Sequence, residues 1–84
     1  MPYIKAEDRT KFNAILDKLP EMKVKGELEY CIYKLMVRYM KTRERKYSEL
    51  HDTVYSAMHC AEEYRRWNLD TREDTARATN GDIK

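Results

Sequence analysis

Residues 26–40 read Gly26-Glu27-Leu28-Glu29-Tyr30-Cys31-Ile32-Tyr33-Lys34-Leu35-Met36-Val37-Arg38-Tyr39-Met40. At 3.6 residues per turn this segment has two apolar arcs on one helix. The first arc, which we expect to form the seam against the rest of the chain, is Leu28, Cys31, Ile32, Leu35 and Tyr39. The second arc is Tyr30, Tyr33, Met36, Val37 and Met40. Only a narrow polar line remains, so the pattern predicts a central helix buried on most of its circumference.

The chain is short for so apolar a helix. Its 84 residues are enough for one domain, and a chain of this size buries only roughly 60–65 % of its unfolded surface. A core this small supplies about 3–5 kcal/mol, so small proteins add disulfides, metals or partner subunits. Two flanking helices can cover one arc of the central helix. We therefore expect a dimer or higher homo-oligomer that forms through the second arc.

The segment before the central helix predicts a short helix. Glu7 and Asp8 suit its first turn, where the helix dipole favours negative charge. We expect it to end at Leu19, because Pro20 follows and the residue before a proline avoids the α region.

The segment after the central helix predicts a long third helix. Ser48 is placed to cap its N-terminus. Apolar positions then recur at spacings of four, three, four and three, as in a helix packed at a shallow angle; they are Leu50, Val54, Ala57, Ala61 and Tyr64. The prediction is an all-α fold of three helices, the last two forming an antiparallel hairpin. We expect one domain at residues 1–78 and a polar tail at 79–84.

Composition excludes several classes. With 38 % charged and 42 % hydrophobic residues and only two Gly and two Pro, the chain is neither disordered nor a β-sandwich. No apolar run approaches the roughly 20 residues that span a membrane, and the N-terminus lacks a signal-peptide layout, so we expect a cytoplasmic protein. Cys31 and Cys60 are expected to be reduced.

The net charge of +2 hides an asymmetry between the two halves. Residues 1–46 carry 12 Lys and Arg against 7 Asp and Glu, a net of +5, whereas residues 47–84 carry 5 against 8, a net of −3. The halves can attract each other within a helix hairpin or between subunits. Alternatively, the basic half recruits an anion such as a nucleotide or nucleic acid.

Two clusters combine cationic and aromatic side chains, which together neutralise phosphate and stack a base. The first comprises Lys34, Arg38, Lys41 and Arg45, with Arg43 and Lys46 nearby and Tyr30, Tyr33 and Tyr39 flanking them. The second comprises Tyr64, Arg65 and Arg66 beside Trp67. The simpler interpretation is that the aromatic rings are core or interface and that the long cations cover the end of a bundle. No helix-turn-helix signature is present, so sequence-specific DNA binding is not expected.

Catalytic patterns are weak. Asp52, Ser56, His59 and Glu63 share one helix face, an arrangement that suits a metal or a general base but is more typical of a solvated surface. Helical nucleotide pyrophosphohydrolases hold magnesium with paired carboxylates on two helices. Glu49 and Asp52 form one pair, but Glu27 and Glu29 diverge by about 160° on the helix. We predict no catalytic residue, no metal site and no cofactor.

Five motifs lie in a characteristic order along nearly the whole chain. They are Met1-Pro2-Tyr3-Ile4 with Glu7-Asp8-Arg9, Gly26-Glu27-Leu28, Tyr47-Ser48, Ala61-Glu62-Glu63-Tyr64-Arg65-Arg66 and Asn80-Gly81-Asp82. In this the chain resembles a group of small uncharacterised proteins of bacteriophage and bacterial genomes, the DUF6899 family. The resemblance implies a phage-associated accessory protein that acts in the bacterial cytoplasm.

The expected function is therefore non-enzymatic binding. A phage-associated protein of this kind would sequester a bacterial partner or a small anionic ligand such as a signalling nucleotide, in the manner of a counter-defence factor. One alternative is a magnesium-dependent nucleotide pyrophosphohydrolase that depends on Glu49 and Asp52. A third possibility is a purely structural oligomer, with neither ligand nor turnover.

Overall fold

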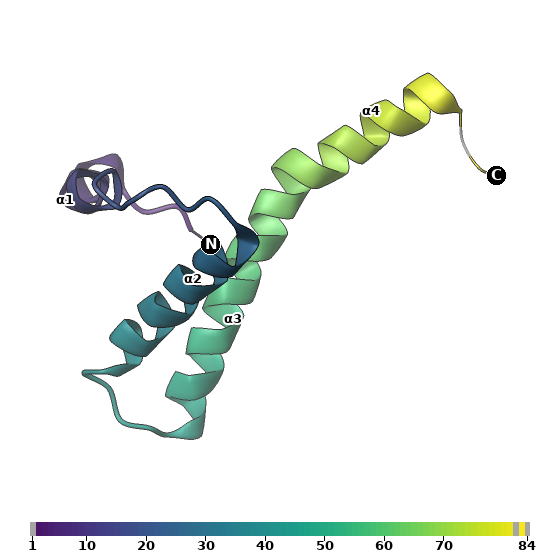
Figure 1. Cartoon of the computed structure of the whole chain (residues 1–84). Coiled ribbons are helices and arrows are strands. Elements are labelled where there is room, and N and C mark those ends of the chain that lie inside the picture. The colour runs from purple at the N-terminus through teal and green to yellow at the C-terminus, as the bar shows by residue number, and fades with distance from the viewer. Residues whose placement is uncertain (1, 82, 84) are drawn as a thin grey trace.

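The computed structural model describes residues 2–81 and 83, and this part of the chain is helical without strands. Its elements are α1 (Ala6–Leu16), α2 (Lys25–Met40), α3 (Tyr47–Tyr64), the π-helix η1 (Arg65–Leu69) and α4 (Asp70–Asn80). The last three follow one another without a break, so they form one rod (Figure 1). The predicted all-α fold with three helical segments is confirmed.

The first helix is shorter than predicted. α1 ends at Leu16, and Leu19 lies beyond it in a tight turn. The backbone N–H of Lys18 donates to the carbonyl of Ile15 at 3.0 Å, and that of Leu19 donates to Leu16 at 3.1 Å. These bonds span three residues, so the chain has left the α-helix before the proline. The expected end at Leu19 is wrong, because the influence of Pro20 reaches back over a whole turn.

Glu27 organises the start of α2. Val24, just before the helix, is extended. The Glu27 carboxylate accepts hydrogen bonds from the backbone N–H of Lys23 at 2.7 Å and of Val24 at 3.4 Å. It also places negative charge in the first turn, where the helix dipole favours it. Glu27 thus satisfies backbone N–H groups that precede the helix and fixes the entry of the chain into α2.

The third helix begins without the predicted cap. Lys46 is the extended residue before α3, Tyr47 is the first helical residue, and no side chain caps the N-terminus. Ser48 therefore lies inside the first turn, and its prediction as the cap is wrong. The acidic side chain in this turn is Glu49, which is held by Arg43 from the preceding loop at 3.5 Å.

Among the described helices that are separated by a loop, α2 and α3 are the pair that packs together. Its centre is Thr53, which is 7 % exposed and is the buried residue among those described. Its hydroxyl donates to the carbonyl of Glu49 at 2.8 Å, so no polar group is left unsatisfied. The other least exposed positions of the two helices are Cys31, Met36, Met40, Glu49, Leu50, Ala57 and Glu63.

This seam differs from the predicted one on both helices. Leu35 of the first arc is 53 % exposed, whereas Met36 and Met40 of the second arc are half-buried. On α3 the predicted Val54 and Tyr64 are 46 % and 71 % exposed. The seam runs between the two arcs of α2, because α3 crosses α2 at a threonine that a pattern of apolar residues passes over.

The isolated chain has no apolar core. No apolar side chain within residues 2–81 or at 83 is buried. Its accessible surface is 8221 Å², whereas a compact monomer of 10.2 kDa exposes about 5,300 Å². The radius of gyration is 16.8 Å, against about 12 Å for a compact domain of this length. Burial of α2 around most of its circumference is therefore not achieved within one chain.

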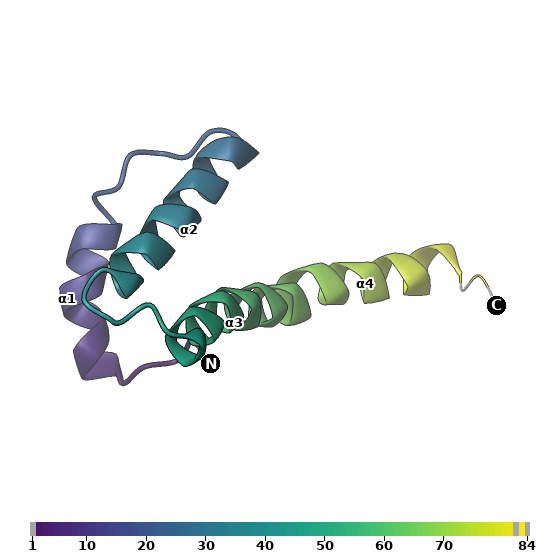
Figure 2. The same cartoon turned by 90° about the horizontal axis from the view of Figure 1, so that it is seen from below.

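The end of the rod projects away from the other helices. α4 packs only against η1, and Figures 1 and 2 show it reaching beyond α2 and α3. It ends at Gly81, whose φ of +88° favours glycine and whose N–H bonds the carbonyl of Arg77 at 2.9 Å. The helix thus continues two residues past the predicted boundary at 78, and the division into domain and tail stays a prediction. None of the described helices combines the length and apolarity that crossing a bilayer requires.

Backbone amides of α4 should exchange with solvent much faster than those of α3. An 11-residue helix is marginal in water without tertiary contacts, and α4 has none beyond η1. Hydrogen exchange followed by mass spectrometry would resolve residues 70–80 from residues 47–64. Protection of α4 equal to that of α3 would contradict this expectation and would mean that another chain covers it.

Candidate functional site

The candidate site is built on the π-helix. In η1 the backbone N–H of Asp70 reaches the carbonyl of Arg65, five residues back. Such wider turns are rare in proteins and are often found at functional positions, because they turn the following side chains relative to the preceding ones. No residue pattern in the sequence analysis indicated this turn. It occurs where the second predicted cluster lies.

A shared carboxylate joins the N-terminal segment to this turn. Glu63 is half-buried and accepts hydrogen bonds from the Tyr3 hydroxyl at 3.2 Å and from the indole N–H of Trp67. Partial desolvation of the phenol, followed by the hydrogen bond and negative charge of Glu63, raises the pKa of Tyr3 above its ordinary value of 10.0. Two aromatic side chains 64 positions apart thus meet at one acidic group.

The two arginines of the turn have different surroundings. The Arg65 Nε lies 3.3 Å from a carboxylate oxygen of Asp70, which partly offsets its charge. The Arg66 guanidinium lies 5.3 Å from the centre of the Trp67 ring, in cation–π contact. Tyr64 is 71 % exposed. The structure therefore places Arg66 and Trp67 in contact, with Tyr64 and Arg65 exposed beside them along the chain. This patch at η1 suits an anion with a planar group.

The first predicted cluster lies elsewhere. Lys34, Arg38, Lys41 and Arg45 are exposed, and within the described residues none of them has a carboxylate oxygen within 4.0 Å. Arg45 precedes α3 and Arg66 follows it, so the 18 residues of α3, about 27 Å of helix, lie between them. One chain does not bring the two clusters into one site.

Arg43 has a structural role at the turn between α2 and α3. Its guanidinium carbon lies 3.6 Å from the centre of the Tyr39 ring, its Nη1 donates to the Tyr39 carbonyl at 2.8 Å, and its Nε lies 3.5 Å from Glu49. These contacts fix the turn and leave little of this cation for a ligand. The sequence analysis did not predict this role, and the spacing of four between Tyr39 and Arg43 was the available signal.

An aromatic column along α3 was also missed. The rings of His51 and Tyr55 are stacked with centres 4.2 Å apart, and Tyr47 and His59 extend the column at 5.6 and 6.3 Å. The repeat of four residues was the available signal. With Tyr39 of α2, the rings of His51, Tyr55 and His59 line an open cleft of about 370 Å³.

The predicted polar face of α3 is divided. Asp52, Ser56 and His59 line this cleft, whereas Glu63 is engaged by Tyr3 and Trp67. In the described part of the chain, no group of three or more His, Cys, Asp or Glu side chains is arranged to hold a metal ion. Glu49 is paired with Arg43, so it does not act together with Asp52 as one carboxylate pair.

Alkaline titration tests the contact between Tyr3 and Glu63. The difference in phenolate absorbance between the wild type and Tyr3→Phe should have its midpoint above pH 10.0, and Glu63→Gln should lower that midpoint. Because the folded state favours the neutral phenol, the stabilisation is complete below pH 10.0 and is lost as pH rises through the higher folded pKa. A Tyr3 midpoint at or below 10.0 would show that the contact with Glu63 is absent in solution.

Comparison with known proteins identifies a family. The family model described as a domain of unknown function, DUF6899, matches residues 1–83. No curated protein and no solved structure matches the chain. Since the match spans almost all of the chain, as the order of its motifs predicted, this protein belongs to the DUF6899 family.

Proposed function

We infer that this protein is a non-enzymatic binding protein that works as a homo-oligomer. The observation that carries the proposal is the absence of any buried apolar side chain among the described residues. Residues 2–81 and 83 include 23 exposed large apolar side chains and one buried residue, which is polar. Such a chain reaches a stable fold by covering those side chains with another chain. In this assembly α2 and α3 form an antiparallel hairpin, favoured by the short turn at residues 41–46. Copies associate through the exposed side of α2.

The ligand that the patch at η1 suits best is a small anion with a planar ring, such as a signalling nucleotide. Arg66 and Trp67 supply a cation over an aromatic ring, and Tyr64 supplies a second exposed ring. Oligomerisation would place several such patches, and the cations Lys34, Arg38, Lys41 and Arg45, on one particle. With the phage setting that the resemblance implies, we propose sequestration of such a ligand, or of a bacterial partner, in the cytoplasm as a counter-defence activity.

Native mass spectrometry of protein purified gently from bacterial lysate tests oligomerisation and ligand sequestration together. A multimer that carries additional mass in the range of a nucleotide would support oligomerisation and sequestration. A multimer without added mass would favour a structural oligomer, or a protein partner, over nucleotide sequestration. A monomer at micromolar concentration would overturn the proposal, because the single chain would then be stable without covering its apolar surface.

Charge reversal tests the patch directly. Arg66→Glu should weaken binding of any retained nucleotide at least about tenfold, because one ion pair with phosphate is replaced by repulsion. Arg38→Glu tests the first cluster in the same way. The control is Arg72→Glu on α4, which changes the net charge equally but lies outside both clusters. Equal affinity in Arg66→Glu and Arg72→Glu would exclude the patch at η1 as the binding site.

Magnesium-dependent nucleotide turnover that disappears in Glu49→Ala or Asp52→Ala would instead support the pyrophosphohydrolase alternative.

A further inference from the structure

α1 is a helix without a helical partner in its own chain. It packs against none of the other described helices. Three apolar side chains share one side of it, Phe12, Ile15 and Leu16, and they are 49 %, 68 % and 47 % exposed. Isolated helices of 11 residues are marginal in water and depend on packing of an apolar face. Something outside the chain therefore has to cover this face if α1 is to stay helical.

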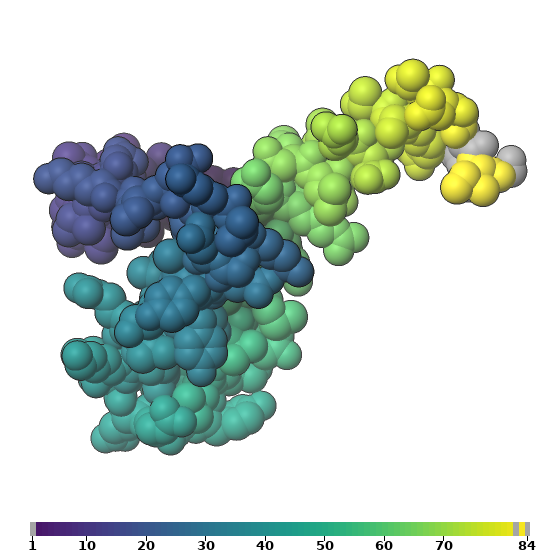
Figure 3. Space-filling view, in the orientation of Figure 1, coloured from purple at the N-terminus to yellow at the C-terminus, as the bar shows by residue number. Residues whose placement is uncertain are grey.

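The chain holds α1 away from α2 and α3. Tyr3 fixes the segment before it to Glu63, and residues 20–23 after it are not helical. Figure 3 shows α1 and this connection as a lobe beside the α2–α3 pair. A helix that is joined through non-helical segments and packs against none of the other described helices of its chain is suited to exchange between copies.

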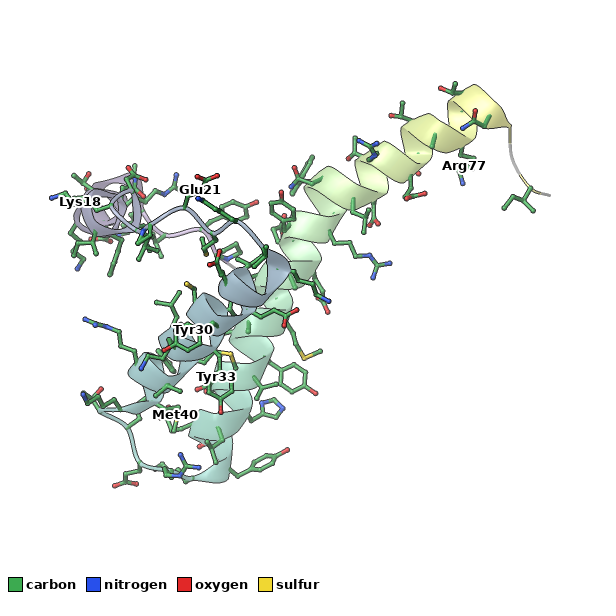
Figure 4. The ribbon with its side chains drawn as sticks, viewed as in Figure 1. Lys18, Glu21, Tyr30, Tyr33, Met40 and Arg77 are labelled. Atoms are coloured by element: carbon green, nitrogen blue, oxygen red, sulfur yellow. The ribbon has the colours of Figure 1, made fainter. Side chains whose placement is uncertain are left out.

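A receiving surface exists at the start of α2. An open cleft of about 410 Å³ lies between the connection and the first turns of that helix. Gly26 leaves space there, because a Cβ at this position would meet no atom within 4 Å. Tyr30 joins the cleft to the exposed side of α2, and Figure 4 shows Tyr30 and Tyr33 on neighbouring turns. The apolar side chains of the lining are Leu19, Pro20, Met22, Val24, Tyr30 and Cys31.

The chain's own α1 is not positioned to enter this cleft. Only Asp17 and Lys18 separate its last residue from Leu19 in the lining. The backbone N–H groups of both are bonded back into α1, to the carbonyls of Asn13 at 2.9 Å and Ile15 at 3.0 Å. The helix therefore leads away from the cleft, and a reversal would require these bonds to break.

We propose that two copies of this chain exchange α1, so that Phe12, Ile15 and Leu16 of each copy pack into the cleft and against Tyr30 of the other. The inference rests on the self-association proposed above and adds which surface of each copy contacts the other. The areas agree, because the chain exposes roughly 2,900 Å² more than a compact monomer. Obligate dimers bury about 1,000–2,500 Å² per subunit, so the surplus is large enough to supply the interface of a stable dimer.

Cysteine cross-linking between two distinguishable chains tests the exchange. The first chain carries Ile15→Cys with Cys31→Ser and Cys60→Ser, and the second carries Cys60→Ser and keeps Cys31. After mixing, refolding and mild oxidation, we expect a covalent heterodimer as the main product, identified by mass. The matched control replaces Ile15→Cys with Ala14→Cys, on the opposite side of α1, and should give at least fivefold less heterodimer.

Each other outcome is decisive. An intramolecular disulfide in a chain that holds both Ile15→Cys and Cys31 would show that α1 packs on its own chain. A dimer by native mass spectrometry without the heterodimer cross-link would overturn the exchange and leave self-association intact, whereas a monomer would overturn both. As a second measurement, Ile15→Glu should weaken dimerisation at least tenfold relative to Ala14→Glu. Equal dissociation constants for these two variants would contradict the proposal.

Discussion

Val37→Glu should raise the dissociation constant of the oligomer at least a hundredfold and lower its midpoint temperature of unfolding. Val37 lies on the second arc of α2 and is 47 % exposed in the single chain, where we propose that another copy covers it. Glutamate has a higher helix propensity than valine, so the substitution favours the isolated helix. The expected loss therefore comes from an unpaired charge in the interface, which costs about 3–5 kcal/mol.

Sedimentation equilibrium and thermal unfolding as a function of protein concentration would measure this effect. Lys34→Glu, one turn away on the polar line of the same helix, is the control and should retain the oligomer. A Val37→Glu protein with unchanged association would place the interface elsewhere. A wild type whose unfolding is independent of concentration would argue against association as the source of stability.

Arg43→Ala should reduce the free energy of unfolding by about 1–2 kcal/mol, since it removes a cation–π contact and a backbone hydrogen bond. Glu49 would lose its partner at the same turn. We expect no additional gain from the ion pair itself, because both side chains are about a third exposed and solvent screens them. Urea denaturation at fixed protein concentration would measure the change.

Arg43→Lys is the informative control for this turn. Lysine keeps the charge but lacks the planar group that stacks on Tyr39 and donates in a fixed direction. We expect it to recover less than half of the lost stability. Full recovery would mean that charge, and not the stacked geometry, fixes the turn between α2 and α3.

Several local features were predictable from neighbouring residues. The helical class and the extent of α2, within one residue at its start, follow from apolar periodicity. The acidic first turns of α1 and α3 contain the expected Glu7, Asp8 and Glu49. The glycine at the end of α4 has the positive φ that the Asn80-Gly81 pair indicated as a turn. Each depends on interactions within about four residues.

The candidate site was predictable only in part. Arg66 and Trp67 are adjacent in the sequence, so both had to lie on the same stretch of helix. That Tyr3 joins them through Glu63 was not predictable, because Tyr3 and Glu63 are 60 positions apart. The π-helix was also not predictable from the pattern, since an α-helix of the same residues has the same apolar spacing.

Periodicity and motif order are local properties, so the residues alone were enough to predict the helical class, the position of α2 and the family. Which sides of the helices meet depends on packing between distant residues, and it became visible in the folded chain. Thr53 lies at the crossing because a small side chain whose hydroxyl bonds its own helix permits close approach, and this turns the seam away from Leu35 and Val54. The structure also established that one chain leaves its apolar surface exposed, since burial depends on how helices are placed in space and not on how apolar each one is.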